Sequence, residues 1–272
     1  MPWHTVFLRI VKTSGYKMVL MKGVKLHMYQ GLTTAAVIVA AGKGKRMGTQ
    51  VSKQFLEING KPILAYTLDV FEHCPFLDRI VLVTAVENIE YCKREIVERY
   101  GFTKVKQLIP GGSERQFSVY NGLLALKGKT DLVLIHDGVR PFVKQEDILK
   151  TVETAAVYDA CVLGVPVKDT IKVCDEETVI TDTPRRDTLW SIQTPQTFRY
   201  KLICDAYEKA IQQKIAGTDD SMLAEKNGTA VRVAMGSYDN IKITTMEDLY
   251  LAEFMVRRSI ETKSTKGGET TP

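Results

Sequence analysis

The chain has 272 residues, 44% of them hydrophobic and 25% charged, a composition that is typical of folded globular proteins and excludes a disordered chain. Its net charge of +5 is accounted for by residues 1–33, which hold five basic residues and no acidic ones. The remainder is neutral overall, so the charge gives no reason to expect nucleic acid as a partner. No apolar run is long enough for a helix that spans a membrane.

The five cysteines are scattered along the chain and none belongs to a CxxC pair. A disulfide framework and a zinc site both need regular cysteine spacing, which this sequence lacks. We therefore predict a cytoplasmic protein.

Composition divides the chain into three regions. Residues 1–33 form a basic extension without the apolar core of a secretory signal. We expect them to be disordered, or to result from a translation start upstream of the start of the domain. Residues 34–258 are expected to form the folded domain. Residues 259–272, rich in Thr, Lys and Gly, are expected to be a disordered tail.

The first element of the domain is an apolar run at residues 35–40. Its small and β-branched residues predict a strand buried on both faces of a parallel sheet. The strand ends in the glycine-rich, cationic loop 42–46, and Lys53 follows with no acidic residue before Glu57. Backbone N–H groups and positive charge favour a bound polyphosphate, although neither the P-loop pattern nor the dinucleotide fingerprint is present.

Strands and helices then alternate along the chain. Apolar runs predict strands at residues 79–84, 105–109 and 132–137, and helical spacing predicts helices at 63–71, 87–100, 114–126 and 148–158. This order predicts a Rossmann-like α/β fold with a mostly parallel sheet and helices on both faces.

Three of the predicted strands end in segments that are rich in glycine and charge, at residues 42–46, 111–115 and 136–141. Ligands of such sheets bind beyond the carboxyl ends of the strands, so we expect these segments to converge on a nucleotide. Asp137 could hold a divalent cation or a ribose hydroxyl. Taken singly, Gly111 and Gly112 could form a plain turn, and Asp137 could simply pair with Arg140.

The pattern changes after residue 166. Alternating apolar and polar residues at 167–174 and 179–183 predict a half-exposed β-hairpin arm, spanning about residues 167–188. An exposed arm with open edges usually needs a partner, so we interpret it as a dimerisation element.

Two later segments carry candidate residues. Thr218 is predicted to cap a helix, and residues 241–243 are predicted to form a short strand. Lys242 in that strand could face solvent or a ligand.

Seven motifs now stand in order along the chain: AAGKGKRM followed by Lys53, GGSERQFSV, HDGVRPF, PVKDTIK, LWSIQTPQ, GTDDS and NIKITTMEDL. Together they closely resemble the 2-C-methyl-D-erythritol 4-phosphate cytidylyltransferase family, over about residues 34–258. The resemblance implies a nucleotidyltransferase fold and a homodimer in which the arm reaches the partner's site.

The resemblance also implies roles for individual residues. Arg46 and Lys53 would stabilise the transition state at the α-phosphorus, and Asp137 would bind the metal. Ser113 stands where some relatives have an acidic residue. The nucleotide-binding residues would be Ala40, Ala41, Gly42, Gly44, Gly112, Ser113, Arg115, Ser118, Asp137 and Arg140. The residues binding the second substrate would be Thr170, Arg186, Thr218 and Lys242.

The implied activity is the transfer of CMP from CTP to 2-C-methyl-D-erythritol 4-phosphate, with Mg²⁺ and release of pyrophosphate, in non-mevalonate isoprenoid biosynthesis. A ribitol-5-phosphate cytidylyltransferase is the alternative within the same fold. A non-catalytic nucleotide-binding regulator is the alternative of another class, and it would be expected to lack Arg46 or Lys53, which are both present.

Overall fold

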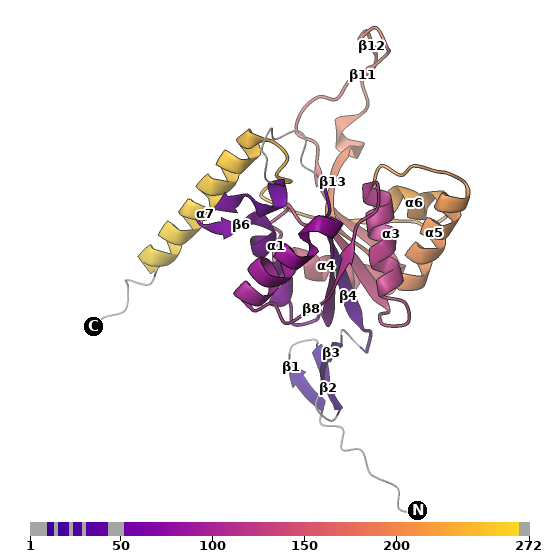
Figure 1. Cartoon of the computed structure of the whole chain (residues 1–272). Coiled ribbons are helices and arrows are strands. Elements are labelled where there is room, and N and C mark those ends of the chain that lie inside the picture. Colours follow the sequence, from indigo (N-terminus) through magenta and orange to yellow (C-terminus); the bar gives the residue numbers. More distant parts are fainter. Residues whose placement is uncertain (1–9, 14–15, 22–23, 29–30, 43–51, 267–272) are drawn as a thin grey trace, which may run out of the picture.

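A computed structural model describes residues 10–13, 16–21, 24–28, 31–42 and 52–266 of the chain (Figure 1). The candidate residues Gly44 and Arg46 lie outside these ranges. None of the helices in the described ranges is long and apolar enough to cross a membrane.

The centre of the domain is a seven-stranded sheet in the order β14-β10-β13-β9-β4-β7-β8. The strands are β4 (Thr34–Ala40), β7 (Arg79–Thr84), β8 (Val105–Pro110), β9 (Leu132–Asp137), β10 (Ala160–Pro166), β13 (Trp190–Arg199) and β14 (Arg232–Met235). The apolar run predicted as the first strand is β4, which pairs in parallel with β7 on one side and β9 on the other. Its residues Ala35 to Ile38 are fully buried, as expected for a strand covered on both faces.

Helices cover both faces of this sheet, as predicted (Figure 1). One face packs against α1 (Ile63–Glu72), α4 (Gln145–Tyr158) and the π-helical segment η4 (Cys92–Glu98), which follows η3 (Val86–Asn88) and α2 (Ile89–Tyr91). The other face packs against α3 (Arg115–Ala125), α5 (Tyr200–Gln212) and α6 (Asp220–Lys226). The two apolar layers place the carboxyl ends of β4 and β9 at the same edge, where a ligand can bind.

Like the helix α5, the antiparallel strand β13 is one of the elements that the sequence pattern did not indicate. It lies between β9 and β10 and runs antiparallel to both, whereas the other neighbouring pairs in the sheet are parallel. Its buried part consists largely of polar side chains, including Gln193, Thr194 and Gln196. A strand whose buried residues are polar and hydrogen-bonded shows no apolar pattern, which explains the omission.

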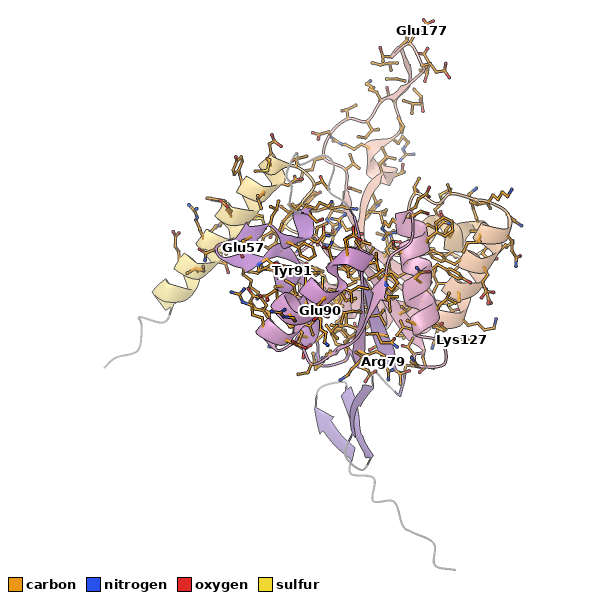
Figure 2. The ribbon with its side chains drawn as sticks, viewed as in Figure 1. Glu57, Arg79, Glu90, Tyr91, Lys127 and Glu177 are labelled. Carbon is orange, nitrogen blue, oxygen red and sulfur yellow. The ribbon has the colours of Figure 1, made fainter. Side chains whose placement is uncertain are left out.

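The predicted arm is present between β10 and β13. It contains a short antiparallel pair, β11 (Val173–Cys174) and β12 (Ile180–Asp182), followed by η5 (Arg186–Thr188). Its ladder is shorter than the alternating pattern of residues 167–174 predicts, since residues 167–172 are not a strand. The arm projects away from the sheet, with Glu177 near its tip (Figure 2).

Parts of both regions for which disorder was one of the expectations are in regular secondary structure. Residues 10–28 contain three antiparallel strands, β1 (Ile10–Thr13), β2 (Tyr16–Met21) and β3 (Val24–Met28). At the other end, α7 (Met246–Lys266) continues through residue 258 into the predicted tail. It starts from an apolar contact with the small hairpin of β5 (Glu57–Ile58) and β6 (Lys61–Pro62), in which Leu249, Ala252 and Val256 pack with Ile58. Burial of these residues, together with helix-forming residues beyond them, extends α7 past the limit drawn from composition.

Candidate active site

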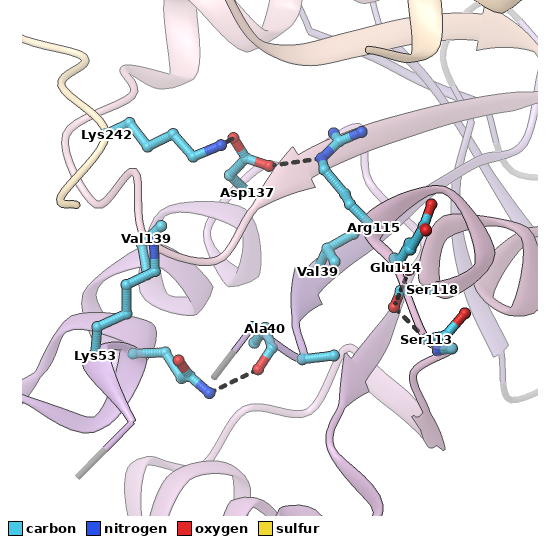
Figure 3. Close-up of a pocket in the computed structure, with 14 residues that line it drawn as sticks. Val39, Ala40, Lys53, Ser113, Glu114, Arg115, Ser118, Asp137, Val139 and Lys242 are labelled. Carbon is cyan, nitrogen blue, oxygen red and sulfur yellow. Dashed lines mark hydrogen bonds and ion pairs between the residues drawn. The ribbon is translucent and has the colours of Figure 1, made fainter. Parts of the chain in front are cut away.

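A cavity of about 670 Å³ opens at the carboxyl ends of β4 and β9 and beside the turn after β8 (Figure 3). It brings together predicted residues from all three strand ends and from the segment after β14. The predicted residues that line it are Ala40, Ala41, Gly42, Lys53, Gly112, Ser113, Arg115, Ser118, Asp137 and Lys242. Val39, Gln54, Glu114 and Val139 complete its lining.

The turn after β8 packs directly against the loop after β4. The Gly111 backbone N–H donates to the carbonyl of Thr84 over 2.8 Å, which holds the turn at the strand end. A Cβ atom on Gly111 would lie 2.5 Å from the Cβ of Ala41, closer than such atoms approach one another. Glycine is therefore required at this position for the two loops to meet, and the turn is part of the cavity wall.

Ser118 shapes that turn from the first part of α3. Its hydroxyl accepts a hydrogen bond from the Gly112 N–H and donates one to the Glu114 carbonyl, both over 3.0 Å. Ser118 thus lines the cavity while its hydroxyl is already engaged in holding the turn.

Lys53 lies in the short helix η2 (Lys53–Phe55), whose position is set by its neighbour Gln54. The buried Gln54 amide donates to the carbonyl of Ala40 over 2.8 Å, so η2 is attached to the end of β4 (Figure 3). Gln54 was missed by sequence reasoning, and its place directly after a candidate lysine is the only signal that could have indicated it.

Asp137 is the electrostatic centre of the cavity. Arg115 Nε lies 3.2 Å from its Oδ1, while Lys242 Nζ and Arg140 Nε lie 2.9 and 3.5 Å from its Oδ2. Burial acts to raise the pKa of Asp137, but the three neighbouring cations outweigh it and hold that pKa well below its ordinary value. Asp137 therefore stays ionised. Its expected pair with Arg140 is present, and Figure 3 shows its contacts with the two further cations, Arg115 and Lys242.

Lys242 comes from an extended segment rather than from the predicted short strand, since residues 241–244 are not in a strand. The segment is attached by the Ile243 N–H, which donates to the carbonyl of Val139 over 2.9 Å. Arg140 Nη1 also donates to the Asn240 carbonyl over 2.8 Å, and Lys242 between these two bonds contacts Asp137, so the lysine faces the cavity.

His136 precedes Asp137 but is fully buried behind the cavity. Its Nδ1 lies 3.0 Å from the Thr194 hydroxyl and its Nε2 lies 3.1 Å from the Arg140 carbonyl. Burial lowers the pKa of His136 to about 4, so its ring is neutral near pH 7. The imidazole therefore ties β9 to β13 and to the Arg140 turn.

Three of the predicted substrate residues lie outside the cavity. Thr170 and Arg186 are exposed in the arm, where Arg186 Nη1 donates to the Lys168 carbonyl over 3.1 Å. Thr218 is also exposed, and the prediction that it caps α6 is wrong. Asp219 is the cap, because its carboxylate, one residue closer to α6, accepts from the Met222 N–H over 2.9 Å.

A second carboxylate behind the cavity was not singled out by sequence reasoning. Asp220, the first residue of α6, accepts two hydrogen bonds from the Arg115 guanidinium, of 2.9 and 2.8 Å. Asp220 belongs to the motif GTDDS, from which the sequence analysis selected Thr218 and not Asp220.

The cavity offers two carboxylates to a metal ion, Asp137 and Glu114. The described residues contain no cluster of three or more His, Cys, Asp or Glu side chains that could hold a metal by themselves. A magnesium ion usually takes one or two carboxylates and completes its shell with water and substrate phosphates. Glu114 and Asp137 supply that number of carboxylates, and Asp137 would exchange one of its paired cations for the ion.

Comparison with known proteins gives a consistent result. Residues 34–258 match the family model described as 2-C-methyl-D-erythritol 4-phosphate cytidylyltransferase. A protein of that name from Geobacter metallireducens is 49% identical over 228 residues, covering 83% of this chain and 98% of the relative. One from Caldanaerobacter subterraneus is 45% identical and covers 84% of this chain and 100% of the relative.

Solved structures agree with the sequence relatives. The crystal structure of 4-diphosphocytidyl-2C-methyl-D-erythritol synthase from Anaerococcus prevotii superposes with a TM-score of 0.74 at 36% identity. The match covers 84% of this chain and 99% of that one. The structure of the corresponding cytidylyltransferase from Thermus thermophilus gives a TM-score of 0.67 at 28% identity.

Proposed function

The chain belongs to the 2-C-methyl-D-erythritol 4-phosphate cytidylyltransferase family, and from this premise we propose how its cavity works. The enzyme transfers CMP from CTP to 2-C-methyl-D-erythritol 4-phosphate, giving 4-diphosphocytidyl-2-C-methyl-D-erythritol and pyrophosphate. This is a step of non-mevalonate isoprenoid biosynthesis.

The chemistry requires two anions to meet. A phosphate oxygen of the acceptor attacks the α-phosphorus of CTP, and the bond from that phosphorus to the β-phosphate oxygen breaks as pyrophosphate leaves with the electron pair. Charge repulsion opposes the approach, so cations aimed at the reacting phosphates lower the barrier. Lys53, Arg115 and Lys242 supply such charge within the cavity, and this arrangement is the observation that carries the proposal.

We assign the nucleotide to the part of the cavity walled by the two glycine-containing loops. Among the described residues other than its chain neighbours, none lies within 4 Å of where a Cβ on Gly42 would be, so they leave room for a phosphate to approach the backbone there. Gly112 and Ser113 face the same space from the turn after β8. Arg46 and Gly44, named by the family motif, are proposed to complete the phosphate end, with Arg46 and Lys53 stabilising the transition state.

We assign the acceptor to the part near Lys242. Arg140, proposed for the nucleotide, does not line the cavity and reaches it through its pair with Asp137. Thr170, Arg186 and Thr218 are proposed to bind the acceptor as well. Thr170 and Arg186 lie in the projecting arm, so we propose that they serve the cavity of a second copy in a homodimer. Support comes from the exposed apolar side chains of the arm, Val173, Val179 and Ile180, which are 45 to 57% exposed in the single chain.

Mg²⁺ is proposed as the cofactor, with Asp137 as its protein ligand. When bound, the ion adds positive charge to the triphosphate. Replacement of Asp137 by Ala should raise the Mg²⁺ concentration needed for half-maximal CTP turnover, and replacement of Glu114 by Gln should change it much less. An unchanged Mg²⁺ dependence in Asp137→Ala would contradict the assignment.

The decisive experiment is pyrophosphate release from CTP and Mg²⁺, with 2-C-methyl-D-erythritol 4-phosphate and ribitol 5-phosphate as alternative acceptors. Turnover with the methylerythritol phosphate alone is expected. Turnover with ribitol 5-phosphate alone would reassign the acceptor and retain the CTP site. No turnover with either acceptor, together with retained CTP binding, would favour a nucleotide-binding regulator.

A further inference from the structure

Arg115 is held from behind the cavity by Asp220. Its Nη1 and Nη2 donate in parallel to the two oxygens of Asp220, over 2.9 and 2.8 Å, and its Nε reaches Asp137 at 3.2 Å. Two parallel bonds fix both the position and the plane of a guanidinium. The direction of Nε toward Asp137 is thus set by a residue that does not line the cavity.

Asp220 is itself fixed on two sides. Its side chain is fully buried, and the Tyr207 hydroxyl from α5 donates to its Oδ1. Burial, and next the Asp220 charge, raise the pKa of Tyr207 well above its ordinary value, so the phenol keeps the proton that it donates. Backbone support comes from Asp219, which caps α6 and accepts from Gln196 of β13 over 2.8 Å.

This arrangement balances the charges around Asp137. Arg115, Arg140 and Lys242 all approach the single carboxylate of Asp137, and Asp220 gives Arg115 a carboxylate of its own. Lys242 can then hold the Oδ2 of Asp137 at 2.9 Å. Without the charge of Asp220, Asp137 would be the nearest carboxylate to the half-buried Arg115 guanidinium. Arg115 would then compete with Lys242 for Asp137.

We propose that Asp220 and Tyr207 are positioning residues for the transfer reaction. They hold the two Nη groups of Arg115 away from Asp137, so that only Nε contacts it and Lys242 stays paired with Asp137 at the acceptor end of the cavity. The inference rests on the proposed function for the identity of the acceptor. It assigns a role to two buried side chains from α5 and α6, neither of which touches the cavity.

The test uses the full chain with Asp220→Asn, which keeps the shape of the side chain and removes its charge. We expect kcat/KM for 2-C-methyl-D-erythritol 4-phosphate to fall about 10-fold or more, because Lys242 is no longer held on Asp137 at the acceptor end. Tyr207→Phe should give a smaller loss of about 3-fold. Unchanged kinetics in Asp220→Asn would overturn the inference.

A double-mutant cycle separates positioning from general support of the fold. In a Lys242→Met background, Asp220→Asn should lower kcat/KM by a further factor of less than about 2, because the residue through which Asp220 acts has already been replaced. Losses that simply multiply would instead mean a structural role and contradict the proposal.

Two controls match the variants. Glu225→Gln removes the charge of an exposed carboxylate on the same helix, and kcat/KM should stay within about 2-fold. Tyr120→Phe removes the hydroxyl of the tyrosine that stacks on Tyr207 with ring centroids 6.1 Å apart, and it should leave the kinetics unchanged.

A crystal structure of Asp220→Asn gives a readout that needs no activity. We expect the 2.9 Å contact of Lys242 with Asp137 to be broken and Arg115 to occupy both oxygens of Asp137. An unmoved Lys242 would overturn the inference. If the wild-type protein transfers no CMP to either acceptor while the variant loses this contact, the proposed function fails and the coupling between Asp220 and Lys242 stands.

Discussion

Asp137 shows how one buried carboxylate can organise a cavity for anionic substrates. An isolated buried charge would be costly, yet the three cations around Asp137 stabilise its ionised form and are in turn stabilised by it. The cluster therefore keeps positive side chains close together before any substrate binds. Such preorganised charge contributes to catalysis because it need not reorient during the reaction.

Lys53 is the cation for which the clearest kinetic effect is expected. Replacement of Lys53 by Met should lower kcat by about 10²-fold, by analogy with the loss of one preorganised donor at a transition state. The measurement is pyrophosphate release at saturating CTP. Lys61→Met is the matched control, because Lys61 pairs with Asp69 over 2.9 Å and does not line the cavity, so its kcat should not change. Equal losses in both variants would argue against a role for Lys53 in the transition state.

His136 makes the stability of the domain depend on pH. Its pKa is about 4 in the folded chain and 6.5 ordinarily, so the unfolded chain binds the additional proton between these values and stability falls as pH drops through that window. Between pH 7 and pH 5 the loss should be about 2 kcal/mol of unfolding free energy. Asp137 does not contribute there, because its ordinary pKa of 3.8 lies below the window and its folded pKa lower still.

Urea unfolding at pH 7 and pH 5 measures this effect. His136→Asn should remove most of the difference between the two pH values, although it should also lower stability at pH 7. His73→Asn, at an exposed histidine, serves as the control and should leave the difference in place. A pH dependence that persists in His136→Asn would refute the assignment.

At the scale of elements, the site depends on the close approach of two loops. A methyl group on Gly111 would meet the Ala41 methyl at 2.5 Å and the Ser118 hydroxyl at 2.9 Å. Gly111→Ala should therefore push the turn after β8 away from the loop after β4 and weaken CTP binding by about 10-fold or more. Equilibrium binding of CTP is the measurement.

The same contact offers its own control. Ala41→Gly removes the methyl group that the new Cβ would strike, so the double variant Gly111→Ala with Ala41→Gly should regain part of the lost affinity. If the second change brings no recovery, the loss has another cause than this contact.

At the scale of the whole molecule, the proposed homodimer would make each cavity depend on two chains. Lys53 lines the cavity of its own chain, and Arg186 is exposed in the arm. A 1:1 mixture of inactive Lys53→Met and Arg186→Ala chains should then recover about a quarter of wild-type activity, because half of the dimers are mixed and each has one intact cavity.

The mixture is best made by joint unfolding and refolding, with analytical ultracentrifugation to confirm the dimer. Two portions refolded separately and then combined provide the control, and they should stay inactive while subunits do not exchange. Absence of recovery in a dimer that is shown to be mixed would mean that Arg186 serves its own chain.

The sequence by itself determined the alternation of strands and helices, the buried central strand and the three strand ends that form the cavity. These features follow from local patterns: an apolar run indicates burial, and glycine beside positive charge indicates an anion site. Gly112 and Asp137 were recognisable because each stands at the end of a predicted strand, and Lys53 because it follows the glycine-rich, cationic loop with no acidic residue before Glu57.

Only the tertiary structure decided how the remaining residues are used. The strand β13 escaped prediction because its buried side chains are polar and are satisfied by residues distant in the chain, as when Gln196 bonds Asp219. Lys242 turned toward Asp137, and Arg115 was fixed by Asp220, through contacts that span about 105 positions of sequence. Ion pairs between such distant residues leave no local pattern, because the fold that brings them together is set by the apolar residues around them.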